Sequence, residues 1–244
     1  MPRFFPKTRR KLLRDMVHDR AEPDSTSVIQ RVSQNRTREN YALAARHVPG
    51  QRVLDIGPGF GLAHDRLIAA GPEKIICVDK FDQSRKNFTV RDDRIEHHRL
   101  DFLENDFADG EFGVVICVAT MYYLTDHARF LAEISRILKP GGVLVINNFD
   151  RAVMRTLFGL TLAELDPRYG PVYDGDEFAR IVGDSLGGAV KIHVQSPVRW
   201  TPRWRRWISL ATLPIRLIAT SPRLVPADGV RLRGVYTMLE ARKA

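Results

Sequence analysis

The sequence predicts a doubly wound α/β domain, in which a mostly parallel β-sheet has helices on both faces. Short apolar segments alternate with segments of helical periodicity along residues 52–147. The apolar segments are continuous, which is typical of strands buried on both sides. The chain has 244 residues, of which 44% are hydrophobic and 27% charged, enough for one sizeable core and unlike a disordered chain.

The expected elements follow from these patterns in chain order. The expected helices are residues 27–48, 62–70, 80–90, 127–138, 152–165 and 176–186. Apolar residues recur every three or four positions at residues 27–48 and 127–138, whereas residues 80–90 are a polar stretch. The expected strands are residues 52–56, 74–79, 94–100, 112–118, 143–147, 190–198 and 230–240, the last of them antiparallel. Glycine and proline mark the turns at residues 49–50, 71–72 and 139–142.

The strongest functional signal is a glycine turn, VLDIGPGFG at residues 53–61. Glycines let the backbone turn sharply after a strand and let a ligand approach where a Cβ would clash. The spacing G-x-G-x-G differs from the G-x-G-x-x-G of a dinucleotide site, and Asp55 lies two residues before the first glycine. The turn therefore predicts a ligand site at the end of the first strand.

Two further acidic residues end the next two predicted strands. Asp79 lies 24 positions after Asp55, and Asp101 is followed by Phe102. A carboxylate at Asp79 can accept hydrogen bonds from both ribose hydroxyls, and Asp101 can accept one from an adenine amine. Taken singly, each acid is also compatible with a helix cap, a turn residue or a surface charge. Together they predict an adenosine ligand at the carboxyl edge of the sheet.

Over roughly residues 41–149, these motifs and the sequence LKPGG at residues 138–142 resemble the class I S-adenosylmethionine-dependent methyltransferases. The resemblance implies a Rossmann-like, seven-stranded sheet that ends in an antiparallel hairpin, and S-adenosyl-L-methionine as cofactor. It implies that Asp55 acts on the amino end of the methionine portion, directly or through water. The other cofactor-binding residues that it implies are Gly57, Gly59 and Gly61 at the methionine portion, Asp79 and Lys80 near the ribose, Asp101 and Phe102 at the adenine, and Ala119 and Thr120 beside the methyl group.

No catalytic base can be assigned from the sequence. The sulfonium of this cofactor makes its methyl carbon electrophilic, so neither a covalent nucleophile nor a metal is required, and no metal site is predicted. An oxygen or carbon acceptor needs its proton removed, and the candidates are Tyr122, Tyr123 and His127. Structural roles are favoured for all three: the tyrosines shape the pocket, and His127 begins a helix. Whether oxygen, nitrogen or carbon is methylated stays open.

Positive charge is concentrated at the two ends of the chain. The net charge is +9, with +5 in residues 1–20 and +8 in residues 199–244 around a slightly acidic middle. This pattern favours an anionic partner or serves solubility. Residues 200–218 combine tryptophan and arginine, and three interpretations are open: a lid over the substrate, peripheral contact with an anionic membrane, or, less favoured, contact with nucleic acid.

The main hypothesis is methyl transfer to a small-molecule or lipid-like acceptor. The alternatives are an RNA methyltransferase and a non-catalytic module that binds S-adenosylmethionine. We expect a basic helical lead-in at residues 1–40 and a single domain at residues 41–244, with a lid or insertion around 150–225. The chain has two cysteines, which we interpret as buried thiols, and no apolar run of about 18 residues. Together these features predict a cytoplasmic protein, free or at the inner face of the membrane. The oligomeric state stays open.

Overall fold

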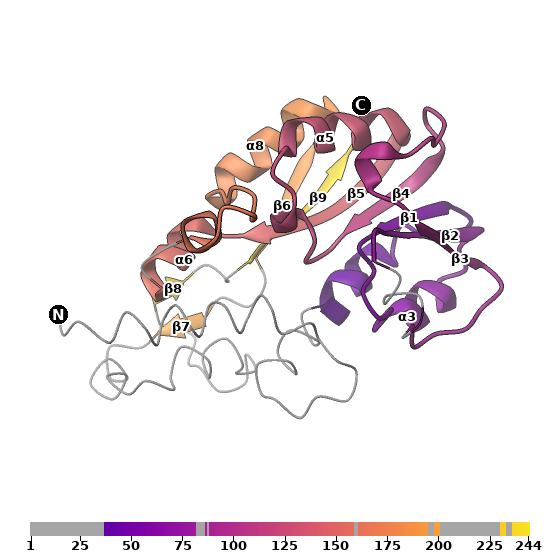
Figure 1. The fold of residues 1–244 in the computed structure, drawn as a ribbon, viewed down its shortest axis with the longest axis horizontal. Helices are drawn as coiled ribbons and strands as arrows, with labels where there is room; N and C mark the ends of the chain where they lie inside the picture. The colour runs from indigo at the N-terminus through magenta and orange to yellow at the C-terminus, as the bar shows by residue number, and fades with distance from the viewer. Residues whose placement is uncertain are drawn as a thin grey trace.

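The computed structural model describes residues 37–81, 86, 88–158, 161–194, 198–200, 230–232 and 236–244. Within them, seven strands form one sheet in the order β3-β2-β1-β4-β5-β9-β6 (Figure 1). These strands are β1 (Arg52–Ile56), β2 (Lys74–Asp79), β3 (Ile95–Arg99), β4 (Phe112–Cys117), β5 (Leu138–Phe149), β6 (Val190–Val194) and β9 (Tyr236–Arg242). A separate antiparallel pair is formed by β7 (Val198–Trp200) and β8 (Val230–Leu232).

The direction of the strands matches the predicted mixed sheet. Strands β1 to β5 pair in parallel, and β9 lies antiparallel between β5 and β6. Because β2 and β4 flank β1 on opposite sides, the strand order reverses at the β1/β4 boundary, where ligands bind in open α/β sheets. Cys77 and Cys117 lie on opposite sides of β1 as buried free thiols, as predicted.

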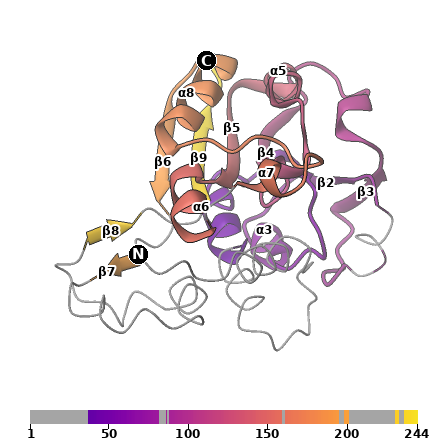
Figure 2. The ribbon, with the colours of Figure 1, turned by 60° about the vertical axis from the view of Figure 1, so that its left-hand side comes forward.

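Helices cover both faces of the sheet, as predicted (Figure 2). The helices α5 (His127–Ile137) and α8 (Gly175–Leu186) pack on one face, where Phe130 and Phe178 are completely buried. The other face is covered by the helical residues 37–44 and by α3 (His64–Ala69), which bury Tyr41 and Leu67. The remaining elements are η1 (Phe102–Glu104), η2 (Met121–Tyr123), α6 (Arg151–Phe158) and α7 (Leu162–Leu165).

The predicted turn at residues 139–142 is wrong, because β5 already begins at Leu138. Leu138 pairs with Phe112 of β4. On the other side, the N–H of Gly141 donates to the carbonyl of Lys243 over 3.1 Å, and the N–H of Lys243 donates to the carbonyl of Gly142 over 3.0 Å. The end of the chain thus supplies hydrogen bonds that keep these glycines in the strand.

Three predicted helices also differ from the structure. The helix expected at residues 62–70 begins only at His64, and the one expected at 152–165 is divided into α6 and α7, with Thr161 capping α7. Residues 88–90 are not helical. Instead, Phe88 is buried, and the Thr89 hydroxyl donates to the carbonyl of Phe60 over 3.0 Å.

Residues 1–36 of the predicted lead-in (residues 1–40) and residues 201–218 of the tryptophan- and arginine-bearing segment (residues 200–218) lie outside the described residues. The same applies to the helix prediction for residues 27–36. In the part of the chain that is described, no helix combines the length and the apolarity needed to cross a bilayer.

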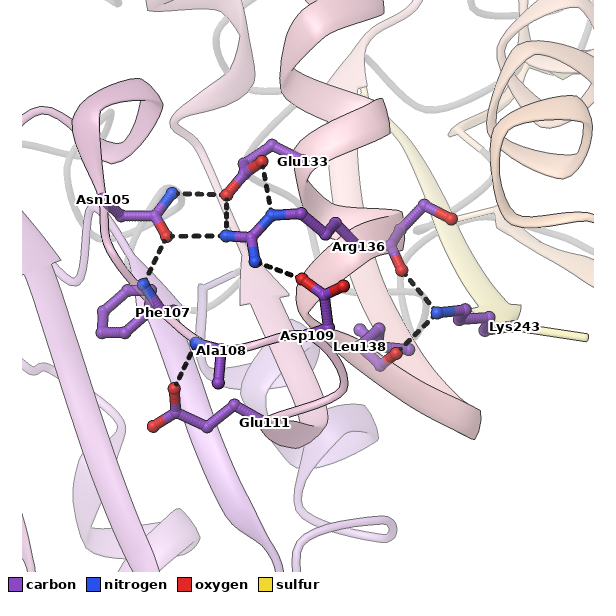
Figure 3. Close-up of polar contacts among 10 residues, drawn as sticks. Asn105, Phe107, Ala108, Asp109, Glu111, Glu133, Arg136, Leu138 and Lys243 are labelled. Carbon is purple, nitrogen blue, oxygen red and sulfur yellow. Dashed lines mark hydrogen bonds and ion pairs between the residues drawn. The ribbon is translucent and has the colours of Figure 1, made fainter.

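A polar network holds the C-terminal end of α5 (Figure 3). This end lies where β5 begins, at the opposite edge of the sheet from the glycine turn, which follows the carboxyl end of β1. The Arg136 guanidinium donates to the carboxylates of Glu133 and Asp109, at 3.0 and 2.6 Å. The Lys243 ammonium donates to the carbonyls of Ser135 and Leu138 over 2.6 and 2.8 Å. Carbonyls in the last turn of a helix have no partner within it, so Lys243 anchors the end of the chain to α5.

Candidate functional site

The three acidic residues lie at the carboxyl ends of three adjacent parallel strands. Asp55 lies in β1, Asp79 is the last residue of β2, and Asp101 follows β3 by two positions. Since β1, β2 and β3 are neighbours in the sheet, these carboxyl groups share one edge. The three acidic residues thus lie along the carboxyl edge of the sheet, as the sequence predicts.

The glycine turn combines two tightly packed glycines with one that faces open space. All three have positive φ, at +69° for Gly57, +59° for Gly59 and +68° for Gly61. A Cβ on Gly57 would lie 2.3 Å from the Thr120 hydroxyl oxygen, and one on Gly61 would lie 2.4 Å from the Phe88 ring. A Cβ on Gly59 meets no described atom within 4 Å. Gly59 therefore leaves the room for a ligand against the turn.

Asp55 is completely buried, and its two carboxylate oxygens differ in their contacts. The Tyr41 hydroxyl donates to Oδ2 over 2.7 Å, and His64 Nε2 lies 3.0 Å from the same oxygen. Oδ1 is buried and has no hydrogen-bond partner among the residues that the structure describes. Leaving a buried acceptor unpaired costs about 1–3 kcal/mol, so Oδ1 is suited to receive a donor from a ligand.

Asp79 lies half-buried at the start of the loop after β2. Its Oδ1 accepts the backbone N–H of Phe81 over 2.9 Å, which fixes the direction of this loop. The Lys80 ammonium lies 5.5 Å from the centre of the Phe81 ring, close enough for a cation–π contact. Lys80 is thereby held beside the half-exposed ring at the same edge of the sheet.

Asp101 and Phe102 have contacts within the fold itself. Asp101 Oδ1 accepts the N–H of Leu103 over 3.2 Å and so caps η1. The ring of Phe102 is buried, with its centre 5.2 Å from that of Phe130 on α5. Contact of these two residues with an adenine therefore stays a prediction, and the Phe102 ring belongs to the core.

A strained residue follows β4 and lies next to the glycine turn. Ala119 has a φ of +58°, the one positive value among the described residues other than glycine. Its N–H donates to Asn147 Oδ1 over 2.7 Å, which stabilises this conformation. The next side chain, the hydroxyl of Thr120, donates to the carbonyl of Gly57 over 3.3 Å. This contact joins the ends of β1 and β4 at the point where the strand order reverses.

The two candidate tyrosines have different environments. Tyr122 is buried, whereas Tyr123 is 45% exposed, and their ring centres are 4.6 Å apart. Burial, with the neighbouring tyrosines as a smaller cause, raises the pKa of Tyr122 well above its usual value, so its hydroxyl stays protonated. The ring of Tyr123 also lies 5.7 Å from that of Tyr169. Tyr123 is thus the candidate that a substrate can reach directly.

His127 begins α5, as expected, and both of its ring nitrogens have partners. Nε2 lies 3.0 Å from the carbonyl oxygen of Met121, and Nδ1 lies 3.0 Å from the Tyr173 hydroxyl. Because a carbonyl only accepts, Nε2 carries the proton and Nδ1 accepts from Tyr173. Burial lowers the pKa of His127, which keeps the ring neutral. With these contacts in place, neither nitrogen is available as a base.

Sequence patterns did not indicate Tyr41, His64 or Asn147 as site residues. Tyr41 follows the apolar periodicity of its helix and appears from sequence as an ordinary core residue. Asn147 lies in an apolar strand, and nothing in the sequence connects it to Ala119. One signal was present: His64 lies three positions after the last glycine of the turn and three before Leu67, with which it is buried in α3.

Comparison with known proteins adds independent evidence. Residues 54–146 match a family model described as a methyltransferase domain. The chain is 29% identical over 122 residues to a ubiquinone biosynthesis O-methyltransferase of Aromatoleum aromaticum, covering 47% of this chain and 51% of that one. It is 28% identical over 106 residues to 27-O-demethylrifamycin SV methyltransferase of Amycolatopsis mediterranei, covering 41% and 39%. The chain thus spans about half the length, or less, of several curated relatives that it matches.

Solved structures share the whole fold. An S-adenosylmethionine-dependent methyltransferase from Archaeoglobus fulgidus superimposes with a TM-score of 0.61 over 96% of this chain and 99% of its own, at 17% sequence identity. At this identity the likeness concerns the fold. It includes the seven-stranded sheet, whose carboxyl edge carries the glycine turn.

Proposed function

Because this chain belongs to the class I S-adenosylmethionine-dependent methyltransferase family, we propose that it transfers a methyl group from S-adenosyl-L-methionine to a small-molecule or lipid-like acceptor. The observation that carries this proposal is the glycine turn after β1, with open space at Gly59, together with the buried, half-satisfied carboxylate of Asp55 in the strand that leads into this turn.

The residues at this edge fit the proposed cofactor. The unpartnered Asp55 Oδ1 suits the positively charged amino group of its methionine portion. The space at Gly59 accommodates a ligand that lies against the backbone. We assign Gly57, Gly61, Lys80, Asp101, Phe102, Ala119 and Thr120 to the same site, and Asp79 to the ribose hydroxyls.

The chain's residues act mainly by binding and orientation. When bound, the cofactor supplies an electrophilic methyl group on its sulfonium. The remaining tasks are alignment of the acceptor and exclusion of water. The contact between Thr120 and Gly57 at the strand ends suits the first of these tasks. We assign no general base, and Tyr123 is the accessible candidate for an acceptor that must lose a proton.

A small acceptor is supported by the side chains near the end of β4. The rings of Tyr122, Tyr123, Tyr169 and Phe149 form a chain of contacts between 4.6 and 5.7 Å, and Tyr123 is 45% exposed. Aromatic rings of this kind pack well against flat or apolar molecules. One relative is named for ubiquinone biosynthesis and another for 27-O-demethylrifamycin SV, and both names favour a small-molecule acceptor.

The test has two stages. Isothermal titration first measures binding of S-adenosylhomocysteine, the demethylated product, and absence of binding would contradict the proposal. Labelled methyl transfer to fractions of cellular metabolites, lipids and RNA then identifies the acceptor by mass. Label in RNA alone would favour the RNA methyltransferase, and binding without label in any fraction would favour the non-catalytic module.

The lid, membrane and nucleic-acid interpretations of residues 200–218 remain predictions, as does the division into a lead-in and one domain. Residues 201–218 lie outside the described part of the chain, and only Trp200 falls within it. Sedimentation with anionic vesicles, with and without substitution of the arginines at 203, 205 and 206, tests the membrane interpretation.

A further inference from the structure

The buried carboxylate of Asp55 is held from one side only. Both donors, Tyr41 and His64, contact Oδ2, and the equally buried Oδ1 has none among the described residues. A carboxylate oxygen can accept two hydrogen bonds, and a buried charge is normally paired. The donors therefore occupy one oxygen fully and leave the other one for a partner that the described chain does not supply.

The Tyr41 hydroxyl is a fixed, neutral donor. Tyr41 comes from the helical residues 37–44, and its side chain is buried against the sheet. Burial, followed by the negative charge of Asp55, raises the pKa of Tyr41 well above its usual value. The hydroxyl therefore keeps its proton and donates it to Asp55 over 2.7 Å.

His64 is the second fixed donor. It is completely buried, with its ring centre 5.4 Å from that of Tyr41 and 4.7 Å from that of Phe88. Its Nδ1 is buried without a hydrogen-bond partner in the described residues, so a proton there would have no acceptor. We therefore assign the proton to Nε2, which donates to Asp55 over 3.0 Å and leaves the imidazole neutral.

Neither donor neutralises the charge of the carboxylate. The nearby thiol of Cys77, 3.5 Å from His64 Nε2, does not change this balance, because burial raises its pKa well above the usual value and keeps it uncharged. The cluster of Tyr41, Asp55, His64 and Cys77 thus has one buried negative charge, on Asp55, and two acceptors without a partner among the described residues, Asp55 Oδ1 and His64 Nδ1. Of these two, only Asp55 Oδ1 belongs to the charged group. A cationic donor is the ligand group that matches both properties.

We propose that Tyr41 and His64 are positioning residues that hold Asp55 by Oδ2, so that Oδ1 receives the amino group of the cofactor. The inference rests on the proposed function and adds a specific role for two residues that need not touch the cofactor. It predicts that they affect recognition of the amino group and not of the rest of the molecule.

The test uses two ligands and the full chain. S-adenosylhomocysteine contains the amino group, and its deamino analogue retains the carboxylate and adenosine but lacks that group. Titration calorimetry measures both ligands with the wild type, Tyr41→Phe and His64→Leu. Each substitution should weaken binding of S-adenosylhomocysteine roughly 10- to 150-fold, the range for hydrogen bonds to charged groups, and that of the analogue by no more than about twofold.

Tyr173→Phe is the matched control, because it also removes a tyrosine hydroxyl bonded to a histidine, His127, away from Asp55. It should leave the ratio of the two affinities unchanged. Equal weakening of both ligands by Tyr41→Phe and His64→Leu would indicate a purely structural role and overturn the inference. So would unchanged binding in both variants, or a wild type that binds the two ligands equally well. If the wild type binds neither ligand, the proposed function itself fails.

Discussion

The side chain of Asn147 in β5 stabilises the backbone of Ala119 in its left-handed conformation. The Ala119 N–H donates to Asn147 Oδ1 over 2.7 Å, at a φ of +58° that residues with a Cβ rarely adopt. Thr120 follows directly and contacts the carbonyl of Gly57. Asn147 thus connects the middle of the sheet to the position of the glycine turn.

Replacing Asn147 by leucine should lower the free energy of unfolding by about 1–3 kcal/mol, because the Ala119 N–H loses its acceptor. Urea unfolding measures this change. Ala119→Gly is the informative second substitution, since glycine adopts positive φ without strain. In the Ala119→Gly background, Asn147→Leu should lower the free energy of unfolding by less than it does with alanine at position 119. Equal losses in both backgrounds would show that Asn147 does not restrain this conformation.

Gly59→Val should prevent binding of S-adenosylhomocysteine, because its side chain would fill the open space beside the turn. Gly50→Val is a closely matched control: its φ of +66° imposes the same backbone strain, and a Cβ there also meets no described atom within 4 Å. Both variants should lose similar stability, about 1–2 kcal/mol, in thermal unfolding. Titration should show lost binding only for Gly59→Val. Normal binding by this variant would place the cofactor elsewhere.

Local patterns were sufficient to predict much of the fold. The strands β1 and β2 have the predicted bounds, because each is a short apolar run between turn residues. The start of β5 was missed because it depends on hydrogen bonds from Lys243, about a hundred positions further along the chain. Such a contact leaves no periodic signal in the sequence.

The residues of the candidate site also form two groups: those that local spacing predicts and those that it does not. The glycines and the acids at the strand ends were predicted from spacing, because parallel strands bring their ends to one edge. The partners of Asp55 were not predicted, since Tyr41 and His64 meet it only after two helices pack on the same face of the sheet. Which polar groups become buried together is a property of that packing.

Asp79→Asn should weaken binding of S-adenosylhomocysteine by about 1–3 kcal/mol, or roughly 5- to 150-fold, because the ribose loses a charged acceptor. Asparagine keeps an oxygen for the Phe81 N–H, so the loop should retain its direction. Asp184→Asn on α8, which removes an exposed carboxylate paired with Arg180, is the control and should bind normally. Calorimetry distinguishes the two variants, and unchanged affinity in Asp79→Asn would contradict the ribose assignment.

Lys243→Met should destabilise the fold by about 1 kcal/mol, because the carbonyls of Ser135 and Leu138 lose a charged donor at the end of α5. Methionine retains the apolar part of the side chain, so the measured loss in urea unfolding reports on the ammonium group. Affinity for S-adenosylhomocysteine should not change, since the network lies at the other edge of the sheet. Weaker binding by a variant that keeps the stability of the wild type would contradict the expectation that the Lys243 network acts on stability and not on the cofactor site.

His127 should make the stability of the protein depend on pH below neutrality. Burial lowers its pKa in the folded protein from the ordinary value of 6.5, so the unfolded chain binds more protons between the two values. The free energy of unfolding should therefore decrease as the pH falls below about 6.5, and level off below the folded pKa. In His127→Gln, the part of this decrease that comes from His127 should be absent. Urea unfolding of both proteins at pH 7.5, 6.5 and 5.5 measures the difference. NMR titration of the His127 ring should give a midpoint below 6.5, and a midpoint at or above that value would show that burial does not hold the ring neutral.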